Sequence, residues 1–319
     1  MTKKNDSQEK QSWYEKNYKI LFIVPIFLFL FSIVTIFQAI QNDGTPIYRD
    51  VSLKGGLSAI IETTSIQSVE LKIALEERFP ENSFIISNLE EDGQVIGVIV
   101  DTDIKEEVFM SNMNEILGEE LLFGENYSSN FISPTLSLSF FKQAIFILVI
   151  SFVLMSTVIF IYFRAFVPSG AVVLSALFDL IVTIGVLNFF EFHIGVAGVG
   201  ALLMIIGYSI DTDVLLTNRM FKENNNDTLY NKLKFSFETG LLMTGTTLVA
   251  GIGALILTNS EIIFQIALIL VIGLLVDFVS TWFSNAGILY LWLKKREERG
   301  IFSYVSESQN PGKRKKKKR

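Results

Sequence analysis

Five ionisable side chains lie inside or at the end of long apolar runs of this 319-residue sequence. They are Asp179, Asp211, Asp213, Asp277 and Arg219. A charge in hydrocarbon is costly, and such residues commonly bind ions, relay protons or pair with one another. A carboxyl group in a low-dielectric surrounding is suited to reversible proton binding. We therefore expect ion coupling from this set rather than the making or breaking of covalent bonds.

The spacing of two of these acids is informative. Asp211 and Asp213 are two residues apart, which places them about 200° apart around a helix. One is expected to point into a helix bundle and the other towards water or a second subunit. An alternative is that Asp213 stays hydrated near the cytoplasmic interface. Arg219 follows Asp211 by roughly two turns and about 80°, so the two would line one broad face without pairing.

Structural roles are the alternative for the other members of the set. Arg219 at a helix end could extend to lipid phosphates. Asp277 could simply accept hydrogen bonds from a neighbouring span. Asp179 is the hardest to explain in this way, because apolar sequence surrounds it on both sides.

Composition disfavours other kinds of site. The sequence has no cysteine, which excludes disulfides and thiolate metal sites. Its single histidine, His193, lies at the edge of an apolar run and is expected at headgroup level rather than as a catalytic base. No GxxxxGK[ST] loop is present, so no nucleotide site is predicted. We expect no metal, no cofactor and no enzymatic turnover.

The hydrophobic residues, 50% of the sequence, cluster in six runs. A bilayer core of about 30 Å requires roughly 20 apolar residues in a helix. The sequence therefore predicts a polytopic α-helical membrane protein with six transmembrane helices, at about 20–41, 140–163, 170–190, 194–217, 240–257 and 262–292. The first run is too long for a cleaved signal peptide and lacks a small-residue cleavage site, which indicates a signal-anchor.

Basic residues gather on one side of this topology. They occupy the segment 1–19, the loop at Arg164, the region after the fourth run and the tail 294–319. The other side receives the region 42–137, with 18 acidic and five basic residues. The positive-inside rule predicts cytoplasmic termini, an extracytoplasmic 42–137 and a block of spans over 138–293. The tail is expected to contact anionic lipid or ribosomal RNA beside the membrane, with no other nucleic acid as a partner.

Residues 42–137 are predicted to fold as a small α+β domain. The patterns predict strands and helices in the order βαββαβ, at 57–63, 65–79, 83–87, 95–100, 104–117 and 127–132. Gly55-Gly56 precedes the first strand, and Glu91-Asp92-Gly93 is a turn signal. This order is the split βαβ, or ferredoxin-like, pattern.

Small residues in the spans predict close helix packing. Glycine lets backbones approach, and threonine hydroxyls can bond across helices. The residues expected to pack in this way are Gly207, Thr244, Gly245, Thr246 and Thr247.

Several segments are similar to those of a known family. One external domain after the first span and five clustered spans resemble one half of an RND-type permease. RDVSLKGGLSAII resembles the Gly-Gly strand that opens the external domain of SecD and SecF, and TGLLMTGTTL resembles their Thr/Gly-rich fifth span. ALFDLIVTIGV resembles the Asp-containing third span, and ALLMIIGYSIDTDVLLTNRMFKE resembles the fourth-span signature of SecF. Over residues 18–295 the sequence resembles the SecF family.

The sequence departs from the usual bacterial SecF pattern, and one of the departures is closer to archaeal SecF. A phenylalanine precedes Asp179 where bacterial SecF usually has histidine, and the Ile-Asp-Thr-Asp form around Asp211 is more similar to the archaeal sequences. Asp211 also falls where SecD carries an acid implicated in coupling to the proton motive force, and Arg219 matches the family's arginine. The resemblance thus implies that Asp179, Asp211 and Arg219, with contributions from SecD, carry ion coupling, and that Asp213 contributes less if it is hydrated.

The resemblance implies a multi-pass protein of the cell membrane. It would associate with SecD, join the SecY-type Sec translocation channel and aid the late export of unfolded preproteins at the outer face, using the transmembrane ion gradient. Whether the ion is H⁺ or Na⁺ stays open. Two alternatives remain. One is half of an RND-type exporter of lipids or small molecules, which would normally have about twice this span count in one chain. The other is a non-transporting assembly factor of the channel.

Overall fold

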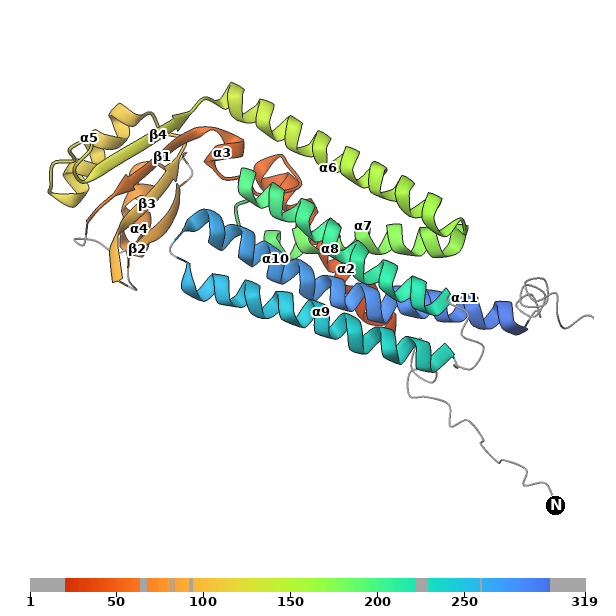
Figure 1. Cartoon of the computed structure of the whole chain (residues 1–319). Helices are drawn as coiled ribbons and strands as arrows, with labels where there is room; N and C mark the ends of the chain where they lie inside the picture. The colour runs from red at the N-terminus through yellow and green to blue at the C-terminus, as the bar shows by residue number, and fades with distance from the viewer. Residues whose placement is uncertain are drawn as a thin grey trace, which may run out of the picture.

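Six long apolar helices form a bundle that carries a small α+β domain at one end (Figure 1). The computed structural model describes residues 21–63, 68–80, 82, 84–91, 94–221, 229–258 and 260–298. Its spans are α2 (Ile23–Asp43), α6 (Pro134–Phe163), α7 (Phe166–Phe189), α8 (Val196–Phe221), α9 (Leu229–Leu257) and α10 (Glu261–Val279), the last continuing through a π-helical segment, η1 (Ser280–Asn285), into α11 (Ala286–Glu298). The prediction of six helices able to cross a membrane is confirmed.

Three of the sequence predictions lie outside the described residues. They concern the segment 1–19, the Asp92-Gly93 turn and the end of the basic tail, 299–319.

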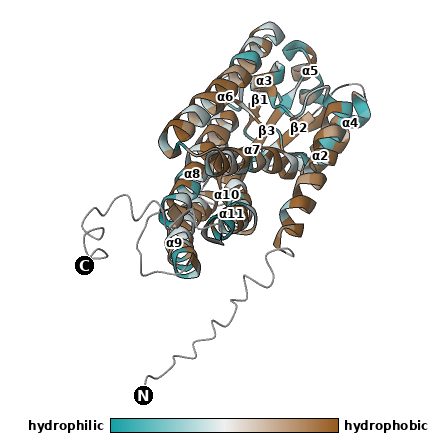
Figure 2. Cartoon of the chain, turned by 90° about the vertical axis from the view of Figure 1, so that its right-hand side faces the viewer, coloured by the Kyte–Doolittle hydropathy of each residue, from teal (hydrophilic) through white to brown (hydrophobic). Residues whose placement is uncertain are grey.

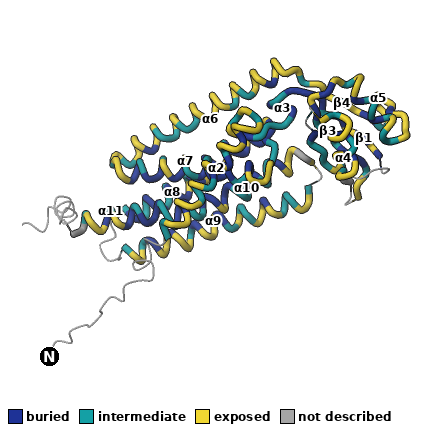
Figure 3. Tube along the Cα trace, turned by 180° about the vertical axis from the view of Figure 1, so that it is seen from behind, coloured by how far each residue is buried: buried dark blue, intermediate teal, exposed yellow. Residues whose placement is uncertain are grey.

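α7 and α8 are the central helices, and α6 and α9 are peripheral. Half of the most apolar stretch of α7 and of α8 is buried, against 17% for α6 and for α9. Figure 3 shows the same contrast, with exposed residues recurring along the outer helices. The outward faces of the spans are largely apolar (Figure 2), as a helix surrounded by lipid requires.

The contact between α2 and α7 depends on a glycine. A methyl group added to Gly185 would collide with Ser32, so only glycine allows the two backbones to come this close. Thr35 Oγ1 donates a hydrogen bond of 2.8 Å to the Gly185 carbonyl across the same contact. Farther along the pair, the rings of Phe29 and Phe178 stack with centroids 6.0 Å apart.

The predicted packing residues mostly do not contact another helix of this chain. A methyl group on Gly207 or Gly245 would meet no described atom within 4 Å. Thr246 and Thr247 donate to the Met243 carbonyl of their own helix. Of this set, only Thr244 is buried. Small residues indicate a capacity for close approach, but composition alone does not say which side of a helix faces a neighbour.

The domain outside the bundle is built on a four-stranded antiparallel sheet with strand order β2-β3-β1-β4. Its elements run β1 (Gly56–Ile61), α4 (Ser68–Arg78), β2 (Phe84–Glu91), β3 (Gln94–Thr102), α5 (Glu106–Leu117) and β4 (Tyr127–Ile132). Alternate strand residues, such as Leu57, Ala59 and Ile61, point into one core with Leu71 and Phe109 from the two helices. A short helix that the sequence did not predict, α3 (Val51–Lys54), precedes β1.

The first strand of the sheet is held against the start of α6. Gly55 has φ +89°, and a side chain there would collide with Pro134. Ser133 caps α6 by accepting a hydrogen bond from the Leu136 backbone N–H, and Pro134 occupies the first turn, where its missing N–H costs nothing. The segments that enter and leave the sheet are therefore fixed to one another.

We predict that Gly185→Leu weakens the bundle by about 1–3 kcal/mol, because overpacking forces α2 away from α7. Thermal unfolding in detergent measures the effect. The matched control is Gly207→Leu, which adds the same side chain where no described atom lies nearby. Equal melting temperatures for the two variants would contradict the packing argument.

Candidate functional site

Three aspartates from three helices lie together in the centre of the bundle. Asp179 of α7 and Asp213 of α8 are 0% exposed, and Asp277 of α10 is 1% exposed. The three are joined through the hydroxyl groups of neighbouring residues in η1. We call Asp179, Asp213 and Asp277 the acid cluster.

Two serines hold Asp179. Ser209 of α8 donates a hydrogen bond of 2.5 Å to one carboxyl oxygen, and Ser280 of η1 donates to the other. Ser175, one turn before Asp179 on α7, donates in turn to the Ser280 oxygen at 3.2 Å. This chain of hydroxyl groups connects α7, α8 and η1.

Thr281 bridges the other two aspartates. Its Oγ1 lies 2.9 Å from Asp213 Oδ1 and 3.2 Å from Asp277 Oδ1. A hydroxyl group has one proton to donate and two lone pairs to accept with. Both contacts can be hydrogen bonds only when one of the two carboxyl groups donates a proton to Thr281. The geometry therefore suits a cluster that holds at least one proton.

The second oxygens of Asp213 and Asp277 are buried without a hydrogen-bond partner among the described residues. Asn285 donates 2.6 Å to the first oxygen of Asp213, but no described lysine or arginine lies within salt-bridge distance of the cluster. Nor do the described residues form a group of acids and histidines suited to a metal ion. Buried carboxylates without a cation repel one another, so protons or a transient monovalent ion must balance the charge.

The π-helical segment supplies three of the side chains that contact the cluster. Ser280, Thr281 and Asn285 all come from η1, which interrupts α10 and α11 immediately after Asp277. A π-turn accommodates one extra residue and often marks a functional site. Here Ser280 contacts Asp179 of α7, and the adjacent Thr281 contacts Asp213 of α8.

The structure corrects the expectation about the paired acids of α8. The alternative that Asp213 stays hydrated is wrong, because its side chain is fully buried in the cluster. Asp211 is instead on the exposed face of α8, so the expected grouping of Asp179 with Asp211 does not occur within this chain. The spacing rule separated the two acids correctly but could not assign which one points inwards.

Arg219 does not join the acids. Its Nη1 donates a hydrogen bond of 2.8 Å to the Phe235 carbonyl, which ties the end of α8 to α9. Within this chain Arg219 therefore connects two helices, and no described acid forms an ion pair with it.

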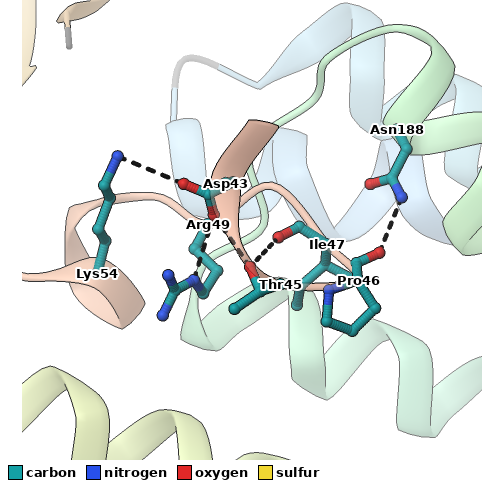
Figure 4. A network of polar contacts seen from close by, with 7 residues as sticks. All are labelled: Asp43, Thr45, Pro46, Ile47, Arg49, Lys54 and Asn188. Carbon is teal, nitrogen blue, oxygen red and sulfur yellow. Dashed lines mark hydrogen bonds and ion pairs between the residues drawn. The ribbon is translucent and has the colours of Figure 1, made fainter. Parts of the chain in front are cut away.

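At the opposite end of the bundle, a polar network connects the sheet domain to the spans (Figure 4). Asp43, at the end of α2, forms ion pairs of 3.4 Å with Arg49 and with Lys54 of α3. Asn188, near the end of α7, donates a hydrogen bond of 2.9 Å to the Pro46 carbonyl. The ends of α2 and α7 are thereby fixed to the segment that leads into the sheet.

The start of α8 is held in a similar way by residues that sequence analysis did not single out. Gln265 of α10 accepts hydrogen bonds from the backbone N–H groups of Gly195 and Gly198 and donates to the His193 carbonyl. Ser52 of α3 accepts from the Val196 N–H at 3.1 Å. The helix that carries Asp213 is therefore joined to the sheet domain at one end and to the acid cluster further along.

A cleft of about 480 Å³ separates the sheet from this end of the bundle. Asp101 of β3 and His193 both line it. Burial raises the pKa of Asp101, and the charge of Asp50 adds to that effect, while a hydrogen bond from Ser58 opposes it. Burial lowers the pKa of His193, against the opposing charge of Asp43. His193 lies between α7 and α8, outside the spans, as its sequence position predicted.

Comparison with known proteins identifies the family. Residues 118–295 match the family described as "Protein export membrane protein SecD/SecF, C-terminal". The chain is 31% identical to "Protein-export membrane protein SecF" of Methanocaldococcus jannaschii, over 90% of this chain and 99% of that protein. The chain belongs to the SecF family. The SecF of Methanolacinia petrolearia is 32% identical over 87% of this chain and 94% of that protein.

A solved structure has the same fold. This chain aligns with the crystal structure of SecDF, a translocon-associated membrane protein from Thermus thermophilus, with a TM-score of 0.71 and 14% identity. The alignment covers 90% of this chain and 39% of the SecDF chain. The resemblance seen in the sequence is thus confirmed, as is the prediction of a multi-pass membrane protein of the SecF type.

We predict a pH dependence that belongs to Asp101. Because its pKa is raised in the folded state, Asp101 binds its proton more tightly in the folded protein than in the unfolded chain. This stabilisation is fully present below the unfolded-state pKa of about 3.9 and is lost as the pH rises through the folded-state pKa. Asp101→Asn cannot ionise, so its melting temperature should rise relative to that of the wild type as the pH increases above about 4. Asp101→Glu, which still titrates, serves as the control. Parallel melting curves for wild type and Asp101→Asn would contradict this assignment.

Proposed function

We propose that this chain is the SecF subunit of a protein-export complex that uses ion movement through the acid cluster to drive a conformational change. The observation that supports this most is the burial of Asp179, Asp213 and Asp277 together with no described cation beside them. Each carboxyl group comes from a different helix. A change in its protonation therefore changes how those helices attract one another.

The coupling works through a linkage between charge and packing. An ionised carboxylate in the cluster requires donors or a cation, and a protonated one does not. Moving one charge across 100 mV supplies about 2.3 kcal/mol. That energy can shift a two-state equilibrium by about fifty-fold. The contacts of Ser52 and Gln265 at the start of α8 offer a path by which a movement of α8 reaches the external domain.

We further propose a placement in the cell membrane. The described basic residues Arg164, Arg219, Lys294 and Lys295 lie at the bundle end away from the sheet, and the positive-inside rule makes this end cytoplasmic. Residues 42–137 are then an extracytoplasmic domain of ferredoxin-like type, an assignment supported by the order β1-α4-β2-β3-α5-β4. The segments 1–19 and 294–319 would be cytoplasmic, flanking the first span at 20–41 and the block 138–293.

SecD is the proposed membrane partner, and α8 carries the face that it would contact. Met204, Gly207, Tyr208 and Asp211 form one exposed stripe along the span. Asp211 lies roughly 22 Å along α8, deep enough for an exposed carboxylate to require a partner in the membrane. Asp211 would thus contribute to coupling across the subunit interface, with Arg219 near the cytoplasmic end. The SecY-type channel and unfolded preprotein are the proposed further partners.

We predict that Asp179→Asn and Asp213→Asn each abolish most of the gradient-dependent gain in export, which is at most about fifty-fold per ion at 100 mV. Asparagine keeps the size of the side chain but cannot bind a proton reversibly. Export of a preprotein into inverted membrane vesicles, with and without an imposed gradient, measures the effect. Asp277→Asn should behave in the same way.

The control for this experiment is export driven without a gradient, which these variants should retain. The assembled complex should also purify intact. Wild-type gradient dependence in a protein that carries all three substitutions would contradict ion coupling and would favour a non-transporting assembly factor.

We predict that Gly207→Leu reduces association with SecD at least several-fold, because it adds a branched side chain to the proposed contact face. Co-purification of the two subunits measures this. Thr157→Leu, on an exposed position of the peripheral helix α6, is the matched control and should leave association unchanged. A normal yield of complex with Gly207→Leu would place the SecD contact elsewhere.

A further inference from the structure

A crevice of about 340 Å³ opens on the side of the bundle between α2, α7 and η1. We call it the lateral crevice. The residues that define it here are Pro25, Phe29, Leu174, Ser175, Ser280 and Asn285. The stacked rings of Phe29 and Phe178 form one of its walls. It is separate from the cleft below the sheet, and the export mechanism above makes no use of it.

The mouth of the crevice is apolar and faces outwards from the spans. Ile26 and Leu30 of α2 are 57% and 58% exposed, and Leu174 of α7 is 63% exposed. On α2 the lining extends from Phe22 to Leu30, roughly 12 Å along the helix axis. In a membrane, this mouth opens onto hydrocarbon.

The floor of the crevice is polar and belongs to the acid cluster. Ser280, which lines the crevice, donates a hydrogen bond to Asp179, and Asn285 donates to Asp213. The carbonyl oxygen of the Asn285 side chain is buried with no partner among the described residues, and the residue is 1% exposed. One layer of side chains therefore separates the crevice from the buried carboxyl groups.

We propose that the lateral crevice binds the hydrocarbon chain of a membrane lipid. The lining residues carry no charge, so the crevice has no charged group to hold a phosphate headgroup. Water would find few polar partners along its apolar walls. A hydrocarbon chain fills such a space without loss of hydrogen bonds, and the surrounding bilayer supplies it at high concentration.

A bound chain would seal the acid cluster from the side. Ions could then reach Asp179 and Asp213 only along the bundle axis, from one aqueous face or the other. The bound chain would also keep water out of the crevice, so that the cluster exchanges ions only along the bundle axis, as coupling to a transmembrane gradient requires. This role rests on the proposed function, whereas occupancy of the crevice does not.

The test uses the full chain in phosphatidylcholine vesicles that contain a small fraction of lipid with a diazirine on the acyl chain. After illumination, mass spectrometry locates the attached lipid. We expect labelling of the segments 22–30 and 171–178 to exceed that of the exposed face of α6 several-fold. Leu174→Trp combined with Ser284→Phe fills the crevice and should remove most of this excess.

The matched control is Leu154→Trp combined with Thr157→Phe on α6, where Leu154 is 62% exposed, close to the value for Leu174. It should leave the crevice labelling unchanged. Leu174→Phe alone gives a milder filling if the double variant melts early. Labelling equal to that of α6 in the wild type, or undiminished in both filled variants, would overturn the proposal. Crosslinks from these segments to another protein in native membranes would also overturn it, whatever the outcome of the export assay.

Discussion

The structure depends on keeping three carboxyl groups buried at one point without a described cation to balance them. Such burial costs several kcal/mol per charge unless protons or hydrogen bonds compensate. The bundle therefore brings hydroxyl and amide groups from α8 and η1 to the three carboxyl groups, which come from α7, α8 and α10. Those contacts require the three helices to meet closely at the same depth. The central position of α7 and α8, and the outer position of α6 and α9, follow from that requirement.

The same helices also connect the acid cluster to the sheet domain. α8 begins at backbone N–H groups that are capped by Gln265 and Ser52, and it continues to Asp213 in the cluster. Because α8 is held at its start and again at Asp213, the stretch between these two points moves as a stiff body more readily than it bends. The polar network around Asp43 holds the end of α2 in the same region. The membrane site and the sheet are thus connected by rigid elements rather than by flexible loops.

Hydropathy and charge were sufficient to predict the six spans, because a lipid surrounding imposes length and apolarity on each helix separately. Alternating patterns located β1 to β4 within a few residues, since one face of the sheet is buried. The burial of Asp213 rather than Asp211 could not be predicted, because it depends on which neighbours surround α8. The packing role of Gly185, the capping by Gln265 and the π-segment likewise arise from contacts between segments distant in the sequence.

The π-segment has a consequence for how the sequence can change. A π-turn holds one residue more than an α-turn, so the helix faces before and after Ser280–Asn285 are out of phase by about 100° relative to an unbroken α-helix. Removing a single residue there would restore a regular α-helix and leave Leu289 and Leu293 near the core to which they belong. The hydrogen bonds that Ser280, Thr281 and Asn285 form with the acid cluster would be lost or rearranged instead. The loops of this chain should therefore tolerate insertions and deletions better than the segment between residues 280 and 285 does.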